Sequence, residues 1–148
     1  MVQRSLSGIW NRVIWGLCVL SSPSLAQETP RGPLAPRQEQ ATLHLVDPGL
    51  TIELAAAEPE VISPVSIAWD ADGFLYVAEM IDYPVARPSG RIKRLEDRDG
   101  DGVYERSTVL ADGLPFPNGV LPCFGGILVT AAPNIWFLKD ANGDGKAD

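Results

Sequence analysis

Short runs of apolar and β-branched residues, separated by Asp/Gly turns, dominate the chain from residue 64 onward. Residues 64–69 and 74–78 are two such runs, and Asp-Ala-Asp-Gly at 70–73 lies between them. An Asp-Gly turn flanked by strand-forming runs is a strong hairpin signal. The pattern therefore predicts an antiparallel hairpin with residues 70–73 as a plain turn.

This pattern is repeated further along the chain. Residues 64–78 recur at 117–131, a shift of 53, and residues 92–97 recur at 135–140, a shift of 43. The first copy therefore carries about ten extra residues, around 80–89. All-strand repeats of roughly 40–50 residues are typical of β-propeller blades, each a four-stranded sheet.

The repeats predict an all-β fold of about two four-stranded propeller blades. Typical propellers have about four to eight blades, because an open arc leaves blade faces uncovered. The last repeat also stops after a turn motif at Asp148. We therefore expect a truncated propeller, with downstream blades or domains in a longer protein.

The amino-terminal residues 1–26 have the pattern of a secretory signal. Arg4 and Arg12 precede or border an apolar run over 13–20, and small residues lead to Ala26. This order of charge, apolar run and small-residue site is typical of export signals. The alternative, a membrane anchor, would need about 20 apolar residues. The expected location is periplasmic or extracellular, with no transmembrane helix after cleavage and with membrane association only through parts that would follow.

The remaining chain divides by composition. Residues 27–42 are rich in Pro, Arg and Gln and nearly free of large apolar residues, which predicts a flexible linker. Residues 43–148 hold the repeats, and a short edge-like strand over 42–46, containing His44, precedes them.

Composition excludes several classes of function. The net charge at pH 7 is −7, with no long basic cluster, which argues against a nucleic-acid partner. One histidine cannot build a multi-histidine zinc site, and without a CxxCH motif the chain binds no c-type haem. After signal cleavage Cys123 has no cysteine partner, so we expect a buried free thiol.

Two nine-residue loops, 97–105 and 140–148, share the pattern D-x-[DN]-G-D-G-x-x-[DE]. Oxygens at positions 1, 3, 5, 7 (a backbone carbonyl) and 9 can surround one hard cation, and such oxygen-only sets favour Ca²⁺. Thr108 stands where an EF-hand has its last glutamate, so the loops are shorter than an EF-hand. The alternative is a pair of metal-free acidic turns. The candidate metal ligands are Asp97, Asp99, Asp101, Val103, Glu105, Asp140, Asn142, Asp144, Lys146 and Asp148.

No catalytic constellation is visible. Glu79, Asp82, Tyr83 and Arg87 lie in or beside the extra segment of the first repeat. They predict either a binding loop or a surface loop with a local ion pair. The sequence has no nucleophile elbow for which His44 could act as the base, so catalytic and cofactor-binding residues stay unassigned.

Several segments together resemble a known family. The residues concerned are 50–59, Val77-Ala78-Glu79-Met80, Asp82-Tyr83-Pro84, Asn118-Gly119-Val120, 131–136 and the terminal GDGKAD. They resemble the amino-terminal propeller of the membrane-bound dehydrogenase proteins of planctomycete-type bacteria, over about residues 43–148. Those proteins are similar to glucose/sorbosone dehydrogenases.

The resemblance implies an exported oxidoreductase that binds pyrroloquinoline quinone and acts on a sugar or an alcohol. It also implies helical repeats and a c-type haem domain further along such proteins. The alternative is a non-enzymatic, calcium-stabilised propeller that recognises a glycan or a protein. A fold analogy alone does not decide between them.

Overall fold

The computed structural model describes residues 32, 34–81, 83–84 and 88–148. The compact unit Leu34–Asp148 is described here by itself. The predicted signal sequence 1–26, residues 27–31 and 33 of the predicted linker, and the loop residues Asp82 and Arg87 lie outside the described residues.

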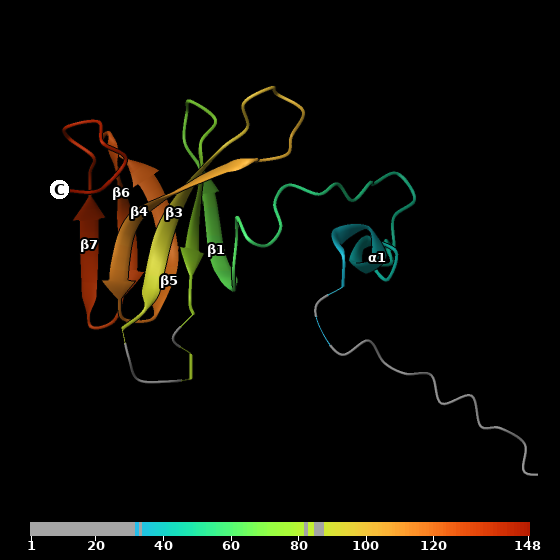
Figure 1. The fold of residues 1–148 in the computed structure, drawn as a ribbon, viewed down its shortest axis with the longest axis horizontal. Helices are drawn as coiled ribbons and strands as arrows, with labels where there is room; N and C mark the ends of the chain where they lie inside the picture. Colours follow the sequence, from blue (N-terminus) through green and yellow to red (C-terminus); the bar gives the residue numbers. More distant parts are fainter. Residues whose placement is uncertain (1–31, 33, 82, 85–87) are drawn as a thin grey trace, which may run out of the picture. The chain divides into compact units, whose positions relative to one another are not determined.

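The regular secondary structure of the described residues is almost entirely antiparallel strand, as the sequence predicted (Figure 1). One sheet has the order β1-β2-β3-β4 and a second has the order β5-β6-β7, so within each sheet consecutive strands pair. A single short helix, α1 (Pro36–Gln40), lies within the predicted linker. The strands are β1 (Pro64–Trp69), β2 (Leu75–Glu79), β3 (Gly90–Glu96), β4 (Arg106–Leu114), β5 (Pro117–Cys123), β6 (Gly126–Ala131) and β7 (Asn134–Leu138).

The two sheets repeat one pairing scheme, but the sequence alignment of their second strands is wrong by one residue. Pro64 pairs with Glu79 and Pro117 with Ala131, each next to a bulge. The shift is therefore 53 for the first strand of each hairpin and 52 for the second. Because side chains alternate along a strand, this one-residue error assigns every side chain of β6 to the wrong face of its sheet.

The difference comes from the two turns. In the β1–β2 turn the Asp70 N–H donates to the Phe74 carbonyl, and Gly73 adopts a φ of 86°. In the β5–β6 turn only Phe124 and Gly125 separate the last pair, and both have positive φ, 51° and 71°. A two-residue turn of this kind is the tightest common hairpin connection. Residues 70–73 are thus a hairpin turn, as predicted.

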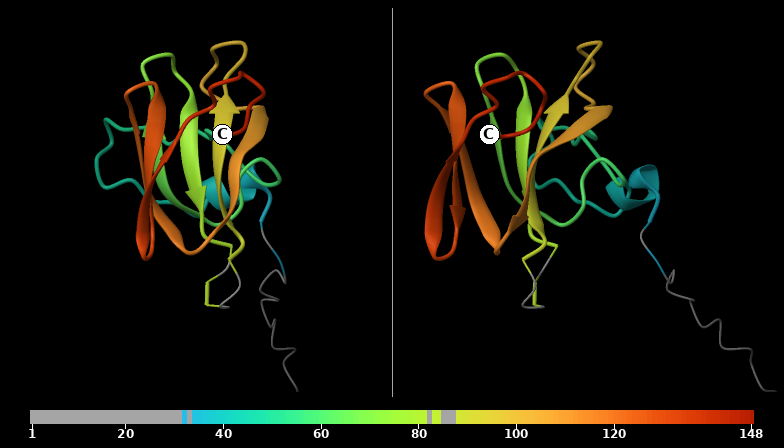
Figure 2. Two further views of the ribbon diagram at one scale, coloured as in Figure 1. Left: turned by 90° about the vertical axis from the view of Figure 1, so that its left-hand side faces the viewer. Right: turned by 60° about the vertical axis from the view of Figure 1, so that its left-hand side comes forward.

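The main core lies between the two sheets (Figure 2). Its buried side chains are Ala78, Ile92, Leu110 and Leu114 from the first sheet and Ile127, Val129, Ala131 and Leu138 from the second. The sheets are in close contact at Gly90, where a Cβ atom would lie 2.2 Å from the Pro117 Cδ atom. A side chain at position 90 would therefore force the sheets apart.

A smaller core covers the opposite face of the first sheet. Leu75, Val77 and Leu95 are buried there against Ala56 and Val61 of the segment that precedes β1. Side chains of β2 thus alternate between the two cores, as the two-residue period of a strand requires.

Two local predictions are wrong. Residues 42–46 form no strand, and Val46 is fully exposed, because no neighbouring strand pairs with this apolar stretch. The Cys123 thiol is free, but the residue is half-buried rather than buried, since β5 ends there at the turn. Within the described residues, no helix has the length and apolar character needed to cross a membrane.

Candidate functional site

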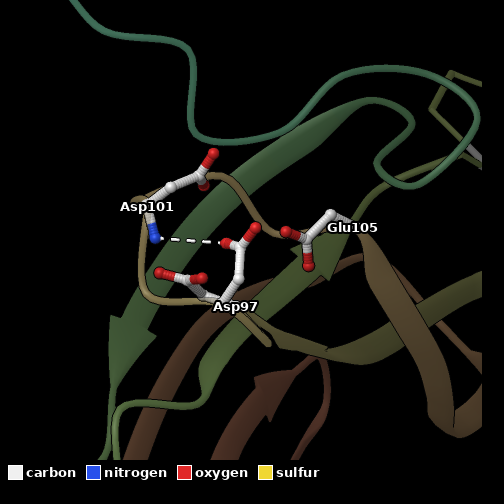
Figure 3. Close-up of side chains that lie close together, drawn as sticks. Asp97, Asp101 and Glu105 are labelled. Atoms are coloured by element: carbon white, nitrogen blue, oxygen red, sulfur yellow. Dashed lines mark hydrogen bonds between the residues drawn. The ribbon is translucent and has the colours of Figure 1, made fainter.

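The first acidic loop gathers the four carboxylates that the sequence selected. One carboxylate oxygen from each of Asp97, Asp99, Asp101 and Glu105 lies within 4.8 Å of the others. Figure 3 shows the side chains of Asp97, Asp101 and Glu105 close together beside the end of the sheet. Oxygens that bind one Ca²⁺ at about 2.3–2.6 Å lie within roughly 5 Å of each other, so the group fits such an ion.

The loop holds this shape through its own backbone. The Asp97 carboxylate accepts hydrogen bonds from the N–H groups of Gly100 (2.7 Å) and Gly102 (2.9 Å). Both glycines have positive φ, 79° and 89°, a conformation that residues with a Cβ atom rarely adopt. The Asp-x-x-Gly-x-Gly spacing therefore folds the chain around the first carboxylate.

The second loop repeats this geometry. Gly143 and Gly145 donate to the Asp140 carboxylate at 2.7 and 2.9 Å, with φ of 80° and 88°. The carboxylates at positions five and nine also accept matching bonds. At position five, the Val103 N–H donates to the Asp101 carboxylate and the Lys146 N–H to the Asp144 carboxylate. At position nine, the Arg98 N–H donates to the Glu105 carboxylate and the Ala141 N–H to the Asp148 carboxylate. Both loops lie at the same end of the sheets (Figure 1).

The loops differ at position three. The Asn142 amide Nδ2 donates to Asp148 Oδ1 at 3.0 Å, so the second loop satisfies its last carboxylate internally. Asp99 stands at the same place in the first loop and has no proton to donate when ionised. Among the described residues, the first loop is accordingly the one group of acidic side chains close enough to share an ion.

A buried ion network lies where the sequence predicted a surface loop. Glu79 is fully buried and forms ion pairs with Arg91 and with Lys93, whose Nζ atom lies 3.4 Å away. Its Oε1 atom also accepts the Ile62 N–H at 2.7 Å. These pairs join β2 to β3 in the interior, whereas the sequence predicted a binding loop or a surface loop with a local ion pair, and Asp82 and Arg87 of that loop lie outside the described residues. Tyr83, from the same extra segment, is exposed as a loop residue.

The alternation of β2 could have identified this network. Leu75, Val77 and Glu79 share one face of the strand, and Lys93 pairs with Val77 from β3. A charged residue that continues an apolar face needs an ion partner.

A hollow of about 490 Å³ lies between the β1–β2 turn and the β5–β6 turn. The Arg94 guanidinium lies 4.8 Å from the centre of the Phe74 ring, and its Nε atom is buried without a hydrogen-bond partner in the described part of the chain. Burial, reinforced by the Asp70 carboxylate, raises the pKa of Tyr76 to about 12, so its hydroxyl keeps its proton at neutral pH. Further lining residues include Trp69, Asp72 and Phe124.

The sequence did not reveal this hollow because its walls come from two hairpins far apart in the chain. Phe74 and Phe124 both line the hollow, but no short sequence motif contains both residues. His44, by contrast, is exposed and lies outside every strand of the described residues.

Comparison with known proteins gives one family. Residues 36–148 match the model of a domain of unknown function, DUF7133. No curated protein and no solved structure matches the chain. The matched range includes both sheets and both acidic loops. The chain therefore belongs to the DUF7133 family.

Proposed function

We propose that the chain is a calcium-stabilised part of an exported β-propeller protein related to quinone-dependent sugar or alcohol dehydrogenases. The observation that carries the calcium proposal is that the first carboxylate of each acidic loop accepts matching backbone hydrogen bonds from two glycines, at corresponding places of the repeat. A turn without a metal does not need alternate acids, whereas a cation site does.

The sheet arrangement supports the propeller. Two consecutive antiparallel sheets lie face to face, and the acidic loop of each follows its third strand. In a propeller such sheets are the blades, and about four to eight of them surround a central channel. The dehydrogenase activity rests on the family resemblance alone, and no described residue is assigned a catalytic role.

Calcium titration of the full chain by calorimetry tests the first part of the proposal. The unmodified protein should bind one Ca²⁺ tightly through the first loop, with a weaker second site. Asp99→Asn should weaken the tight site, because it removes one carboxylate charge and introduces an amide donor. The reciprocal change Asn142→Asp should strengthen the weak site. Two sites that do not respond to this exchange would contradict the proposal.

The hollow between the two turns favours a second candidate, recognition of a glycan. Aromatic side chains with a nearby carboxylate and guanidinium can pack against a sugar ring and hydrogen-bond to its hydroxyl groups. Phe74, Asp72 and Arg94 line the hollow and offer these three kinds of group, with the Arg94 guanidinium over the Phe74 ring.

Tryptophan fluorescence of the calcium-loaded chain separates the two roles. For the dehydrogenase relationship we expect saturable quenching by pyrroloquinoline quinone and an unchanged response in Asp72→Asn. If oligosaccharides alter the signal, quinone does not, and Asp72→Asn loses the sugar response, the recognition role replaces the enzymatic one.

A further inference from the structure

The hollow between the β1–β2 and β5–β6 turns lies at one end of the space between the two sheets. Tyr76 of β2 pairs with Arg94 of β3, and both residues line the hollow. Ala78, two residues along β2 on the same face as Tyr76, already belongs to the core between the sheets. The two turns lie side by side at the same end of the sheets (Figure 2). Both walls of the hollow therefore come from hairpins within the described residues.

Three charged side chains of the described residues line the hollow: Asp70, Asp72 and Arg94. The Arg94 guanidinium lies over the Phe74 ring, and its Nη2 atom lies 3.5 Å from Glu96 Oε1. The Asp70 carboxylate accepts the N–H groups of Asp72 and Phe74, each at 3.0 Å. The exposed Asp72 carboxylate accepts no hydrogen bond and forms no ion pair within the described residues. Asp72 is therefore the charge in the hollow that is left for a ligand.

The environment of Tyr76 shows the sign of the electrostatic potential in the hollow. Burial is the main cause that raises the pKa of Tyr76 to about 12. The Asp70 carboxylate raises this pKa through its charge and a hydrogen bond, and the Asp72 charge adds to the effect. The Arg94 charge lowers the pKa by less than the two carboxylates raise it. The potential at Tyr76 is therefore negative, which favours a positively charged group nearby.

Phe124 places an exposed aromatic ring on the opposite wall. It lies in the β5–β6 turn with a φ of 51°, and its side chain is 91% exposed. Glycine and asparagine are the usual residues at such a turn position, so the turn itself does not require a phenylalanine. An aromatic face attracts a cation and also packs against apolar groups of a ligand.

The remaining polar groups suit a ligand with several hydroxyl groups. A guanidinium has five N–H donors, and in the described part of the chain only the Nη2 atom of Arg94 has an acceptor. The volume of about 490 Å³ lies within the range of small-molecule sites, roughly 300–1,000 Å³. The hollow thus combines hydrogen-bond donors, an aromatic face and an unpaired carboxylate.

We propose that the hollow binds a glycan unit that carries a protonated amine, with the amine beside Asp72 and the sugar ring against Phe124. This names the class of sugar for the recognition role proposed above, and it rests on that role. The amine pairs with the free carboxylate, while the Arg94 guanidinium donates to the hydroxyl groups of the sugar.

Calorimetric titration of the full chain tests the proposal with two matched sugars. The probe is a β-1,4-linked glucosamine tetramer, at a pH where its amines are protonated. The control is the N-acetylglucosamine tetramer, which keeps the sugar rings and lacks the charge. We expect about tenfold tighter binding of the glucosamine tetramer, which corresponds to one hydrogen bond to a charged group.

Asp72→Asn should abolish this tenfold difference, because it removes the carboxylate that pairs with the amine. The matched control is Asp112→Asn, which removes the same charge from an exposed position of β4 outside the hollow and should keep the difference. Phe124→Ala should weaken the binding of both tetramers, because both lose the aromatic face.

Three results would contradict these expectations in different ways. Equal affinity for the two tetramers would overturn the inference and retain the recognition of glycans. Binding of neither tetramer would overturn the recognition role as well. A lysine tetrapeptide that bound as tightly as the glucosamine tetramer would show that the hollow recognises charge without the sugar, which would also overturn the inference.

Discussion

Replacing Glu79 with alanine should lower the free energy of unfolding by about 3–5 kcal/mol, the usual cost of removing one partner of a buried ion pair. The substitution leaves Lys93, which is 5% exposed, without its carboxylate. It also removes the acceptor of the Ile62 N–H. Urea denaturation of the full chain, followed by far-ultraviolet circular dichroism, measures the change.

Glu96→Ala is the matched control. Glu96 lies on β3 and forms ion pairs of 3.5 Å with Arg94 and with the exposed Arg106. Such pairs near the surface contribute about 0–1 kcal/mol, so this variant should unfold almost as the unmodified protein does. If the two variants lost equal stability, the buried network would have no special role.

Calcium should protect the hairpin over residues 92–109 from hydrogen exchange. The four carboxylates of the first loop connect β3 to β4, and an ion bound only in the folded state stabilises it by about 2.7 kcal/mol at a hundredfold excess over Kd. Mg²⁺ should protect less, because it demands a tighter octahedral geometry. Exchange followed by mass spectrometry, with Ca²⁺ and then with a chelator, measures the effect.

Asp99→Ala should abolish most of this protection, and Asp72→Ala should retain it. Asp72 lies in the β1–β2 turn, where a single Asp-Gly pair is followed by no acidic residues at the later ligand positions. Equal exchange with Ca²⁺ and with chelator would mean that the loop is a metal-free acidic turn.

Local signals in the sequence predicted the strands and the acidic loops well. Asp-Gly and Gly-Gly turns mark both hairpins, and the nine-residue loop pattern depends only on spacing within the loop. The all-β class followed from these local features, because turn residues and β-branched runs act over a few positions.

Features that depend on contacts between distant segments were not predicted. The burial of Glu79 depends on Lys93 and on the backbone near residue 60, and the hollow needs both hairpins. The alignment of β2 with β6 is off by one residue because the turn between β5 and β6 is one residue shorter than the turn between β1 and β2. The apolar stretch 42–46 has strand propensity but no partner, and propensity alone does not make a strand.

The Glu79 network has a consequence for the order in which the unit assembles. Lys93 donates to the carbonyls of Pro59 (3.3 Å) and Glu60 (2.6 Å), and Glu79 accepts from Ile62. These charges come from β2 and β3, so the anchor for residues 59–62 exists only after those strands have paired. We therefore expect residues 59–62 to dock after β2 and β3 have paired and to be released when that hairpin opens.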